Sequence, residues 1–144
     1  MEERAEKCDA LQILKVSKFN KTPQRIAVLD ALIKSCAPLC VSDILNKTEA
    51  NQKINKVTVY RILACLKHIG IVREIETGQG IHYYEMACQH NPVHPHFNCR
   101  LCGTLTCMSP LTLSQTWDWF VKAHNYSIEH ININITGLCN RCQK

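Results

Sequence analysis

The chain has 144 residues, a formal net charge of +5 and an ordinary hydrophobic content of 46%, which suit one or two small packed domains. No stretch approaches the ~20 apolar residues of a membrane span, and the charged start MEERAEK lacks the apolar segment of a secretory signal. These features exclude an integral membrane protein and predict a cytoplasmic one. In that compartment ten cysteines suit metal binding or redox chemistry better than disulfides.

The first half of the chain holds most of the lysines and arginines and predicts a series of helices. An amphipathic stretch over residues 10–16 gives the first. The next begins with Thr22 as its N-cap and Pro23 at the first helical position, and Pro38 ends it. A shorter helix then follows, with Ser42 as its N-cap.

Residues 54–70 predict the helix with the clearest functional face, closed by Gly70 at the C′ position. Its apolar stripe consists of Val59, Ile62, Leu63, Leu66 and Ile69. Its opposite face carries Lys56, Tyr60, Arg61, Lys67 and His68. A short core-packed helix of this kind suits the major groove of DNA, where Lys and Arg reach guanine edges or phosphates. The alternative is an ordinary helix with a solvated basic face.

Two short strands around the turn TGQG follow, at residues 71–76 and 81–86, and predict a β-hairpin. Helices followed by a hairpin form a winged helix-turn-helix. This order of elements favours the DNA-binding interpretation of the preceding helix. An ordinary edge hairpin is the alternative.

The second half of the chain gathers sulfur and imidazole ligands. Its clearest pattern is a pair of Cys-x-x-Cys turns, formed by Cys99 with Cys102 and by Cys139 with Cys142. Four thiolates in two tight turns suit the tetrahedral coordination of a structural zinc ion. Two independent redox pairs are the alternative, but a redox pair normally lies in a βαβ unit, and the sequence shows no such pattern.

Between the two turns, residues 111–125 predict a helix, and a strand follows in which Ile131, Ile133 and Ile135 alternate with polar residues. The expected fold class is therefore α+β, with an N-terminal winged helix-turn-helix domain followed by a small α/β domain. An Ile-rich strand in so small a unit needs cover, which a second subunit could supply.

Another set of metal ligands precedes the first Cys-x-x-Cys turn. His94 and His96 are two residues apart in an extended segment, so their imidazoles point to the same side, and Cys88 can fold back onto them. This set favours zinc, because soft sulfur selects against manganese and is unusual for reversible ferrous sites. Surface or core histidines are the alternative. The sequence thus predicts one permanent ion and another at the junction of the two domains.

Four motifs together resemble the ferric uptake regulator (Fur) family: TPQR opening a helix, TVYR in the candidate recognition helix, His-x-His before CxxCG, and a terminal GLCxxC. The resemblance runs from about residue 10 to the C-terminus and is greatest to the zinc uptake regulator branch. It implies a homodimer, a C-terminal dimerisation domain, a structural four-cysteine zinc and a regulatory metal site between the domains. Metal binding would move the two winged helices so that both can bind a palindromic operator in double-stranded DNA. The bound repressor would block transcription of uptake genes.

The resemblance assigns roles to matching positions. The structural zinc ligands are Cys99, Cys102, Cys139 and Cys142. The candidate DNA-binding residues, among which Tyr60 and Arg61 match the family's DNA-contacting pair, are Arg25, Lys56, Thr58, Tyr60 and Arg61.

The regulatory site follows in the same way. His94 and His96 match its imidazoles, and Cys88 falls where the zinc-responsive branch places a thiolate. Glu74 matches the acidic ligand of some zinc regulators. Alternatives for this fourth ligand are Cys40, Glu76, His82 and Glu85.

The segment after CxxCG departs from the family pattern, since it has no acidic residue before Asp118. A third metal site of the kind some members carry is therefore not expected, although His124 and His130 are present. Small apolar packing is the expected role of the remaining cysteines, Cys8, Cys36, Cys65 and Cys107.

The predicted function is a zinc-responsive repressor with one structural and one regulatory zinc ion per chain and no enzymatic activity. An iron- or peroxide-sensing regulator is the alternative within the family. A zinc-dependent hydrolase or thiol oxidoreductase is the alternative from another class, but no His-Glu-x-x-His motif, Gly-rich phosphate loop or evident general base is present. The expected division is 1–86 for the winged helix, 87–96 for the metal-binding hinge and 97–144 for the dimerisation domain.

Overall fold

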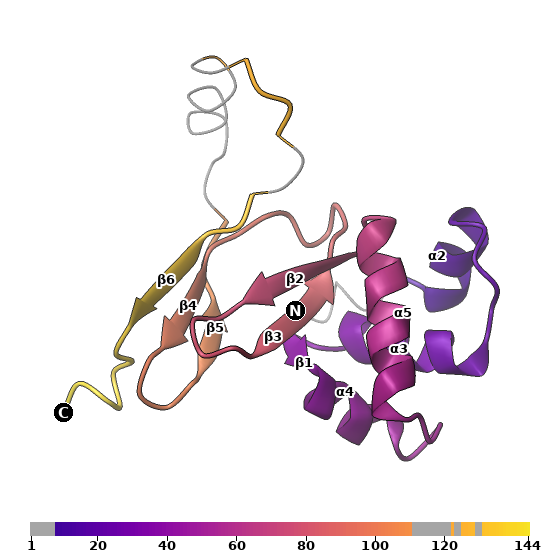
Figure 1. Ribbon diagram of the computed structural model, residues 1–144, viewed down its shortest axis with the longest axis horizontal. Helices are drawn as coiled ribbons and strands as arrows, with labels where there is room; N and C mark the ends of the chain where they lie inside the picture. The colour runs from indigo at the N-terminus through magenta and orange to yellow at the C-terminus, as the bar shows by residue number, and fades with distance from the viewer. Residues whose placement is uncertain (1–7, 111–121, 123–124, 129–130) are drawn as a thin grey trace. The chain divides into compact units, whose positions relative to one another are not determined.

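The computed structural model describes residues 8–110, 122, 125–128 and 131–144. The chain forms two compact units, Met1–Asn91 and Pro92–Lys144, called unit 1 and unit 2 below. Helices and a small sheet make up unit 1, and a second small sheet makes up the described part of unit 2 (Figure 1). This composition confirms the predicted α+β fold class.

The helices of unit 1 pack around α3. They are α2 (Ala10–Val16), α3 (Pro23–Ile33), α4 (Val41–Thr48) and α5 (Lys56–His68). Helix α3 contacts each of the other three, and α4 also contacts α5. Within the described residues, no helix is long and apolar enough to span a membrane.

The start of α3 was predicted correctly. The Thr22 hydroxyl accepts a hydrogen bond from the Arg25 N–H at 3.3 Å, and Pro23 is the first helical residue. The helix ends at Ile33, five residues before Pro38, so the prediction that Pro38 ends it was wrong in detail. The residue before a proline is biased away from helical angles, but that bias does not locate the last turn.

The start of α4 corrects a second prediction. Its N-cap is Cys40, and Ser42 lies inside the first turn. The Asp43 carboxylate accepts a hydrogen bond from the Cys40 N–H at 3.0 Å, which pairs one of the backbone donors at the start of the helix. Acidic side chains in a first turn also interact favourably with the helix dipole.

Helix α5 ends as its sequence predicts. Gly70 has a φ of +75°, the left-handed conformation that favours glycine. The Ile71 N–H donates to the Leu66 carbonyl at 2.9 Å, and the Gly70 N–H donates to the Lys67 carbonyl at 3.0 Å. These two bonds form a Schellman motif, which turns the chain directly into the next strand.

The apolar stripe of α5 faces the core of unit 1. Its Val59, Ile62, Leu63 and Leu66 are buried, whereas Ile69, the C-cap residue, is 36% exposed. Each buried aliphatic side chain contributes about 1.5–3 kcal/mol to folding. The other fully buried aliphatic side chains of this core include Leu14, Val28, Leu29 and Ile44.

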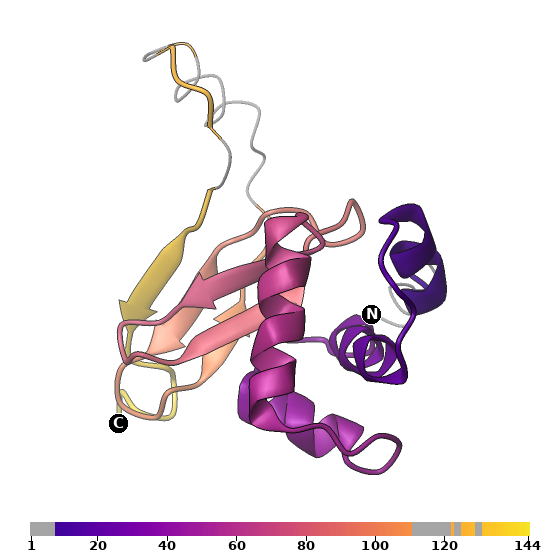
Figure 2. The same cartoon turned by 45° about the vertical axis from the view of Figure 1, so that its right-hand side comes forward.

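The predicted hairpin is present as β2 (Val72–Glu76) and β3 (His82–Met86), which pair antiparallel from Val72 opposite Met86 to Glu76 opposite His82. Helix α5 contacts β2 along this hairpin (Figure 2). A two-residue strand, β1 (Leu39–Cys40), pairs with β3 and gives the order β1-β3-β2. The sequence did not predict β1, because two residues are too few to show a period-2 pattern.

Unit 2 contains a three-stranded sheet in its described part. The strands are β4 (His96–Cys99), β5 (Leu105–Cys107) and β6 (Asn134–Gly137), in the order β5-β4-β6. Strand β4 pairs antiparallel with β5 and parallel with β6. Strand β6 includes only the end of the predicted Ile-rich strand, and the predicted helix at 111–125 lies almost entirely outside the described residues.

Candidate functional site

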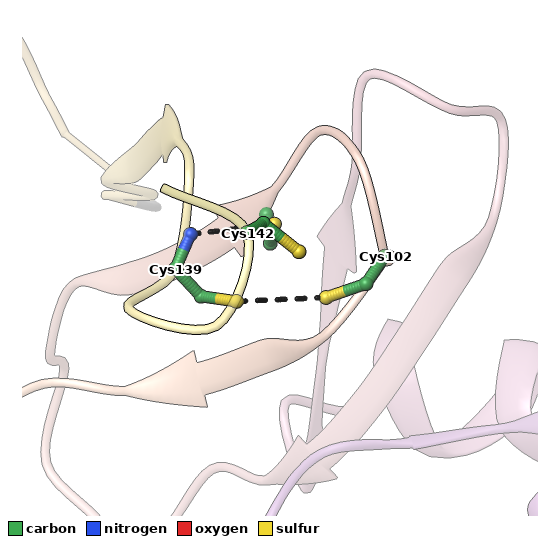
Figure 3. A group of neighbouring side chains, drawn as sticks. Cys102, Cys139 and Cys142 are labelled. Carbon is green, nitrogen blue, oxygen red and sulfur yellow. Dashed lines mark hydrogen bonds between the residues drawn. The ribbon is translucent and has the colours of Figure 1, made fainter. Parts of the chain in front are cut away.

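The four cysteines of the two Cys-x-x-Cys turns lie together in unit 2. Their sulfur atoms lie within 4.8 Å of one another. The parallel pairing of β4 with β6 places Cys99 beside Gly137, so the turn after each strand begins at the same end of the sheet. Figure 3 shows the Cys102 and Cys139 side chains pointing toward each other, with 3.7 Å between their Sγ atoms.

The donor set fits zinc. Tetrahedral coordination with Zn–S bonds of about 2.3 Å requires sulfur atoms roughly 3.8 Å apart, and the Cys102–Cys139 separation of 3.7 Å meets this requirement. The side chain of Cys99 is buried and its sulfur accepts a hydrogen bond from the Cys139 N–H at 3.4 Å. When bound, a zinc ion would link β4 to the C-terminal turn and stabilise the fold of unit 2.

Local hydrogen bonds prepare two of these thiols for deprotonation. Backbone N–H groups of Cys102 and Cys139 lower the pKa of Cys99 to about 6. The Thr104 hydroxyl, 3.1 Å from the Cys102 sulfur, lowers the pKa of Cys102. The neighbouring Cys139 and burial raise the pKa of Cys142 to about 12. Binding of a divalent ion to all four sulfurs would therefore release protons.

A second ligand group in unit 2 contains His94, His96 and Cys107, whose ligand atoms lie within 4.8 Å of one another. Both imidazoles are buried, and their ring centroids are 4.5 Å apart. Cys107 comes from β5, where it lies opposite His96 in the antiparallel pairing with β4. The structure thus brings together the two predicted histidines and places beside them a potential sulfur ligand, Cys107, for which the sequence predicted apolar packing.

The hydrogen bond of His94 determines which ring nitrogen faces a metal. Its Nδ1 lies 2.9 Å from the Pro92 carbonyl oxygen. Because a carbonyl only accepts, Nδ1 carries the proton and Nε2 is the nitrogen that can bind a metal. Metal-binding histidines commonly have such a backbone partner, which orients the ring and makes it a better ligand.

Cys88, predicted to join the two histidines, belongs to unit 1, and in that unit it lies beside two other candidate ligands. Its sulfur is 3.8 Å from the Cys8 sulfur, which in turn is 3.5 Å from His90 Nδ1. These three residues form a separate group of metal-ligand atoms within 4.8 Å of one another. A common site for Cys88, His94 and His96 stays a prediction.

Glu74, the predicted fourth ligand, is held by several partners in unit 1. Its carboxylate pairs with the Lys67 ammonium, accepts a hydrogen bond from the Tyr84 hydroxyl at 3.1 Å and lies 2.9 Å from His82 Nδ1. Burial alone would raise the pKa of Glu74, but the hydrogen bonds from Lys67 and Tyr84 and the adjacent charges lower it overall. In the same contact, burial and the Glu74 charge raise the pKa of Tyr84 well above its usual value.

The alternatives to Glu74 have different surroundings within unit 1. Glu76 and His82 group with Glu74 on the hairpin. Cys40 is half-buried at the start of α4. Glu85 is buried in β3 and forms an ion pair with Arg73, at 2.9 Å between their side-chain atoms.

The predicted DNA-binding face of α5 is exposed to solvent. Lys56, Tyr60 and Arg61 are exposed, and Thr58 is half-buried. The Asn55 side chain accepts a hydrogen bond from the Thr58 N–H at 2.8 Å, which caps the helix just before this face. The Lys56 ammonium lies 5.9 Å from the centroid of the Tyr60 ring, within range of a cation–π interaction.

Arg25 lies on a different helix and is held by local contacts. Its guanidinium donates to the Asn20 carbonyl at 3.0 Å and lies 5.2 Å from the centroid of the Phe19 ring. It is half-buried at the start of α3. DNA contacts by Arg25 and by the α5 residues stay predictions.

Known proteins resemble this chain over nearly its whole length. The profile of the ferric uptake regulator family matches residues 17–136. The peroxide operon regulator of Bacillus subtilis (strain 168) is 26% identical over 137 residues, 94% of this chain and 92% of that protein. The Vibrio cholerae ferric uptake regulator structure has a TM-score of 0.73 at 25% identity, covering 91% of this chain and 100% of that chain. A zinc uptake regulator complexed with zinc and DNA has a TM-score of 0.62 at 25% identity, covering 93% and 90%.

The names of these relatives span peroxide, iron and zinc regulation. They do not specifically support the zinc uptake branch that the sequence motifs favoured. The family match includes helices α3, α4 and α5, the hairpin and most of the metal-ligand positions described above. The chain belongs to the ferric uptake regulator family and is a metal-responsive, DNA-binding transcriptional regulator rather than an enzyme.

Proposed function

We propose that this chain senses zinc and represses metal uptake genes. The observation that carries the proposal is the Cys107 sulfur, which lies with the ligand nitrogens of His94 and His96 within 4.8 Å. One thiolate beside two imidazoles suits zinc and is unfavourable for manganese and unusual for a reversible ferrous site. The buried position of both imidazoles would also exclude water from most of the coordination sphere.

A fourth ligand from unit 1 would complete the tetrahedral coordination of a zinc ion. The candidates are Cys40, Glu74, Glu76, His82, Glu85 and Cys88. Glu85 is buried in β3 and already forms an ion pair with Arg73. Glu74 likewise has cationic partners in Lys67 and His82, so either carboxylate would exchange an ion-pair partner for the metal.

Ligands from both units would couple metal binding to the arrangement of the DNA-binding face. A metal ion changes DNA affinity only if it binds one arrangement of the units more tightly than the others. A difference of about 3 kcal/mol in metal-binding free energy corresponds to a roughly 100-fold change in DNA affinity. The exposed Lys56, Tyr60 and Arg61 of α5 would then contact bases and phosphates.

The functional form proposed is a cytoplasmic homodimer on a palindromic operator in double-stranded DNA. In this chain, Ile135 is 41% exposed on β6, a strand at the edge of the described sheet of unit 2. An exposed apolar residue on such an edge strand is suited to cover by a second copy. Two copies related by twofold symmetry would match an operator with two related half-sites.

Peroxide sensing is the second candidate, because the curated relatives in Bacillus subtilis and Staphylococcus saprophyticus are named as peroxide regulators. The two functions differ in the metal that activates DNA binding. DNA duplexes that bind the protein are first selected from random pools, once with zinc and once with ferrous iron. Binding to the selected duplexes is then measured with each metal, which tests both candidate functions. Activation at sub-nanomolar free zinc that peroxide does not abolish is the result expected for zinc sensing. Activation by ferrous iron alone, abolished by peroxide, would support the second candidate instead.

A further inference from the structure

Cys8, Cys88 and His90 form a ligand group in unit 1, and of the three only Cys88 is also a candidate for the regulatory site. The Cys8 and Cys88 sulfurs are 3.8 Å apart, and the Cys8 sulfur is 3.5 Å from His90 Nδ1. All three ligand atoms lie within 4.8 Å of one another. Cys8 precedes residue 17, where the family match begins, so one of the three ligands lies outside the matched segment.

Several hydrogen bonds fix the loop that carries Cys88 and His90. The Asn91 N–H donates to the Cys88 carbonyl at 2.9 Å and closes a turn that contains Cys88 and His90. The Asn91 side chain, 1% exposed, donates to the Met86 carbonyl at 2.7 Å. From β2, the Arg73 guanidinium donates to the Asn91 carbonyl at 2.6 Å. These bonds fix the position of the loop that carries Cys88 and His90.

The third ligand, Cys8, is positioned by α2. The next residue, Asp9, is the N-cap of this helix, and its carboxylate accepts a hydrogen bond from the Leu11 N–H at 3.0 Å. Ala10 and Leu14 anchor the helix in the core of unit 1. Because both the helix and the ligand loop are fixed by independent contacts, the approach of the two sulfurs follows from the fold.

The separations match zinc coordination. Bonds of about 2.3 Å to sulfur and about 2.0 Å to nitrogen in a tetrahedron require S–S and S–N distances of roughly 3.8 and 3.5 Å, and the observed values are 3.8 and 3.5 Å. A disulfide would instead require the sulfurs to approach to about 2.0 Å. All three side chains are half-buried, so an ion has access from solvent.

We propose that Cys8, Cys88 and His90 bind a zinc ion, separate from the four-cysteine ion of unit 2, with solvent as the fourth ligand. Binding releases the two thiol protons, because zinc coordinates thiolates. The ion would cross-link residues that are 80 positions apart in the chain and fasten α2 to the end of the hairpin. The proposal assigns Cys88 to this site rather than to the site of His94 and His96. It does not depend on which metal the site of His94 and His96 senses.

The experiment compares the reduced full-length protein with Cys8→Ser, which leaves every candidate ligand of the regulatory and structural sites intact. Cys36→Ser is the matched control, since Cys36 is exposed and belongs to none of the ligand groups found among the described residues. The measurements are zinc per chain by mass spectrometry, and thiolate-to-cobalt charge-transfer absorption in a Co²⁺ titration of chelator-treated protein.

The Cys8→Ser variant is expected to bind one ion per chain fewer than the wild type and the Cys36→Ser control. The corresponding cobalt absorption is expected to decrease. The affinity for that ion is expected to fall at least ~10-fold, since loss of a residue that only hydrogen-bonds to a metal ligand already costs about that much. Equal zinc content and cobalt titrations in wild type and Cys8→Ser would overturn the proposal. Recovery of a Cys8–Cys88 disulfide from protein purified without oxidant, in place of bound zinc, would also overturn it. If Cys88→Ser removed an ion but Cys8→Ser did not, Cys88 would belong to the regulatory site instead.

Discussion

His96 lies opposite Cys107 in the antiparallel pairing of β4 with β5, and the ligand atoms of the two residues are within 4.8 Å of each other. The pairing register therefore places residue 107 beside His96, so the side chain at this position determines the type of the third potential ligand. Because sulfur is a softer ligand than a carboxylate, this position is expected to decide which metals the site accepts.

Replacement of the sulfur by a carboxylate tests that expectation. We predict that Cys107→Asp shifts the preference of the regulatory site from zinc toward manganese and ferrous iron, because a hard oxygen replaces a soft sulfur. Zinc affinity is expected to fall at least ~10-fold. Competition between metals, read as metal-dependent DNA binding, measures the shift. Cys65→Ser is a control for the loss of one thiol, because Cys65 is exposed on α5. An unchanged metal preference in Cys107→Asp would exclude Cys107 as a ligand.

The four-cysteine group is expected to be structural. Cys139→Ser should remove one zinc ion per chain and unfold unit 2, because structural zinc binding and folding are coupled. Zinc content, thermal unfolding and the oligomeric state by light scattering provide the measurements. The prediction fails if the variant remains a folded dimer with the zinc content of the wild type.

The exposed face of α5 is expected to carry DNA affinity. Arg61→Ala should weaken DNA binding by about 1–3 kcal/mol if Arg61 contacts a base, or reduce the salt-dependence slope by about one if it contacts a phosphate. Fluorescence anisotropy over a range of salt concentrations separates the two. Lys144→Ala, which removes one positive charge from unit 2, is the matched control. Equal effects of both variants would indicate only a general loss of charge.

The contact between Lys67 and Glu74 predicts a specific pH dependence. The pKa of Glu74 lies below its ordinary value of 4.5 when the protein is folded: burial opposes this shift, but the contacts with Lys67 and Tyr84 outweigh it. Its stabilisation is therefore fully present above pH 4.5 and is lost as the pH falls through the folded pKa. Since the partner Lys67 is exposed to solvent, the effect is expected to stay below about 1 kcal/mol.

Thermal unfolding of wild type and Glu74→Gln, over about pH 3–6, measures this contribution, because the variant cannot titrate at this position. The difference in stability between the two proteins should shrink as the pH falls. Lys67→Met should reduce the same difference by removing the partner charge. A constant difference across this range would show that Glu74 does not contribute through its charge.

Much of unit 1 could be predicted because its signals are local. Thr22 and Pro23 start α3, Gly70 ends α5, and the turn TGQG joins two strands, each through bonds between near neighbours. The four-cysteine group was predictable for a similar reason, since each Cys-x-x-Cys turn needs only one tight local bend.

The missed features depend on contacts between distant parts of the chain. The approach of Cys8 to Cys88 joins residues 80 positions apart, and no local pattern at Cys8 indicates it. The position of Cys107 depends on the register of β4 with β5, where a slip of one residue would turn its side chain to the other face. Two cysteines that the sequence predicts to be apolar packing residues, Cys8 and Cys107, thus lie beside other potential metal ligands in the fold.

In the proposed function, the site containing His94, His96 and Cys107 controls DNA affinity by binding zinc. The most direct measurement is the DNA affinity of wild type and His96→Ala over a series of buffered free zinc concentrations, with the structural zinc content verified in both. Wild-type affinity is expected to rise about 100-fold with free zinc, whereas His96→Ala should retain its structural zinc and stay in the weak state. An identical zinc response in the two proteins would contradict the account.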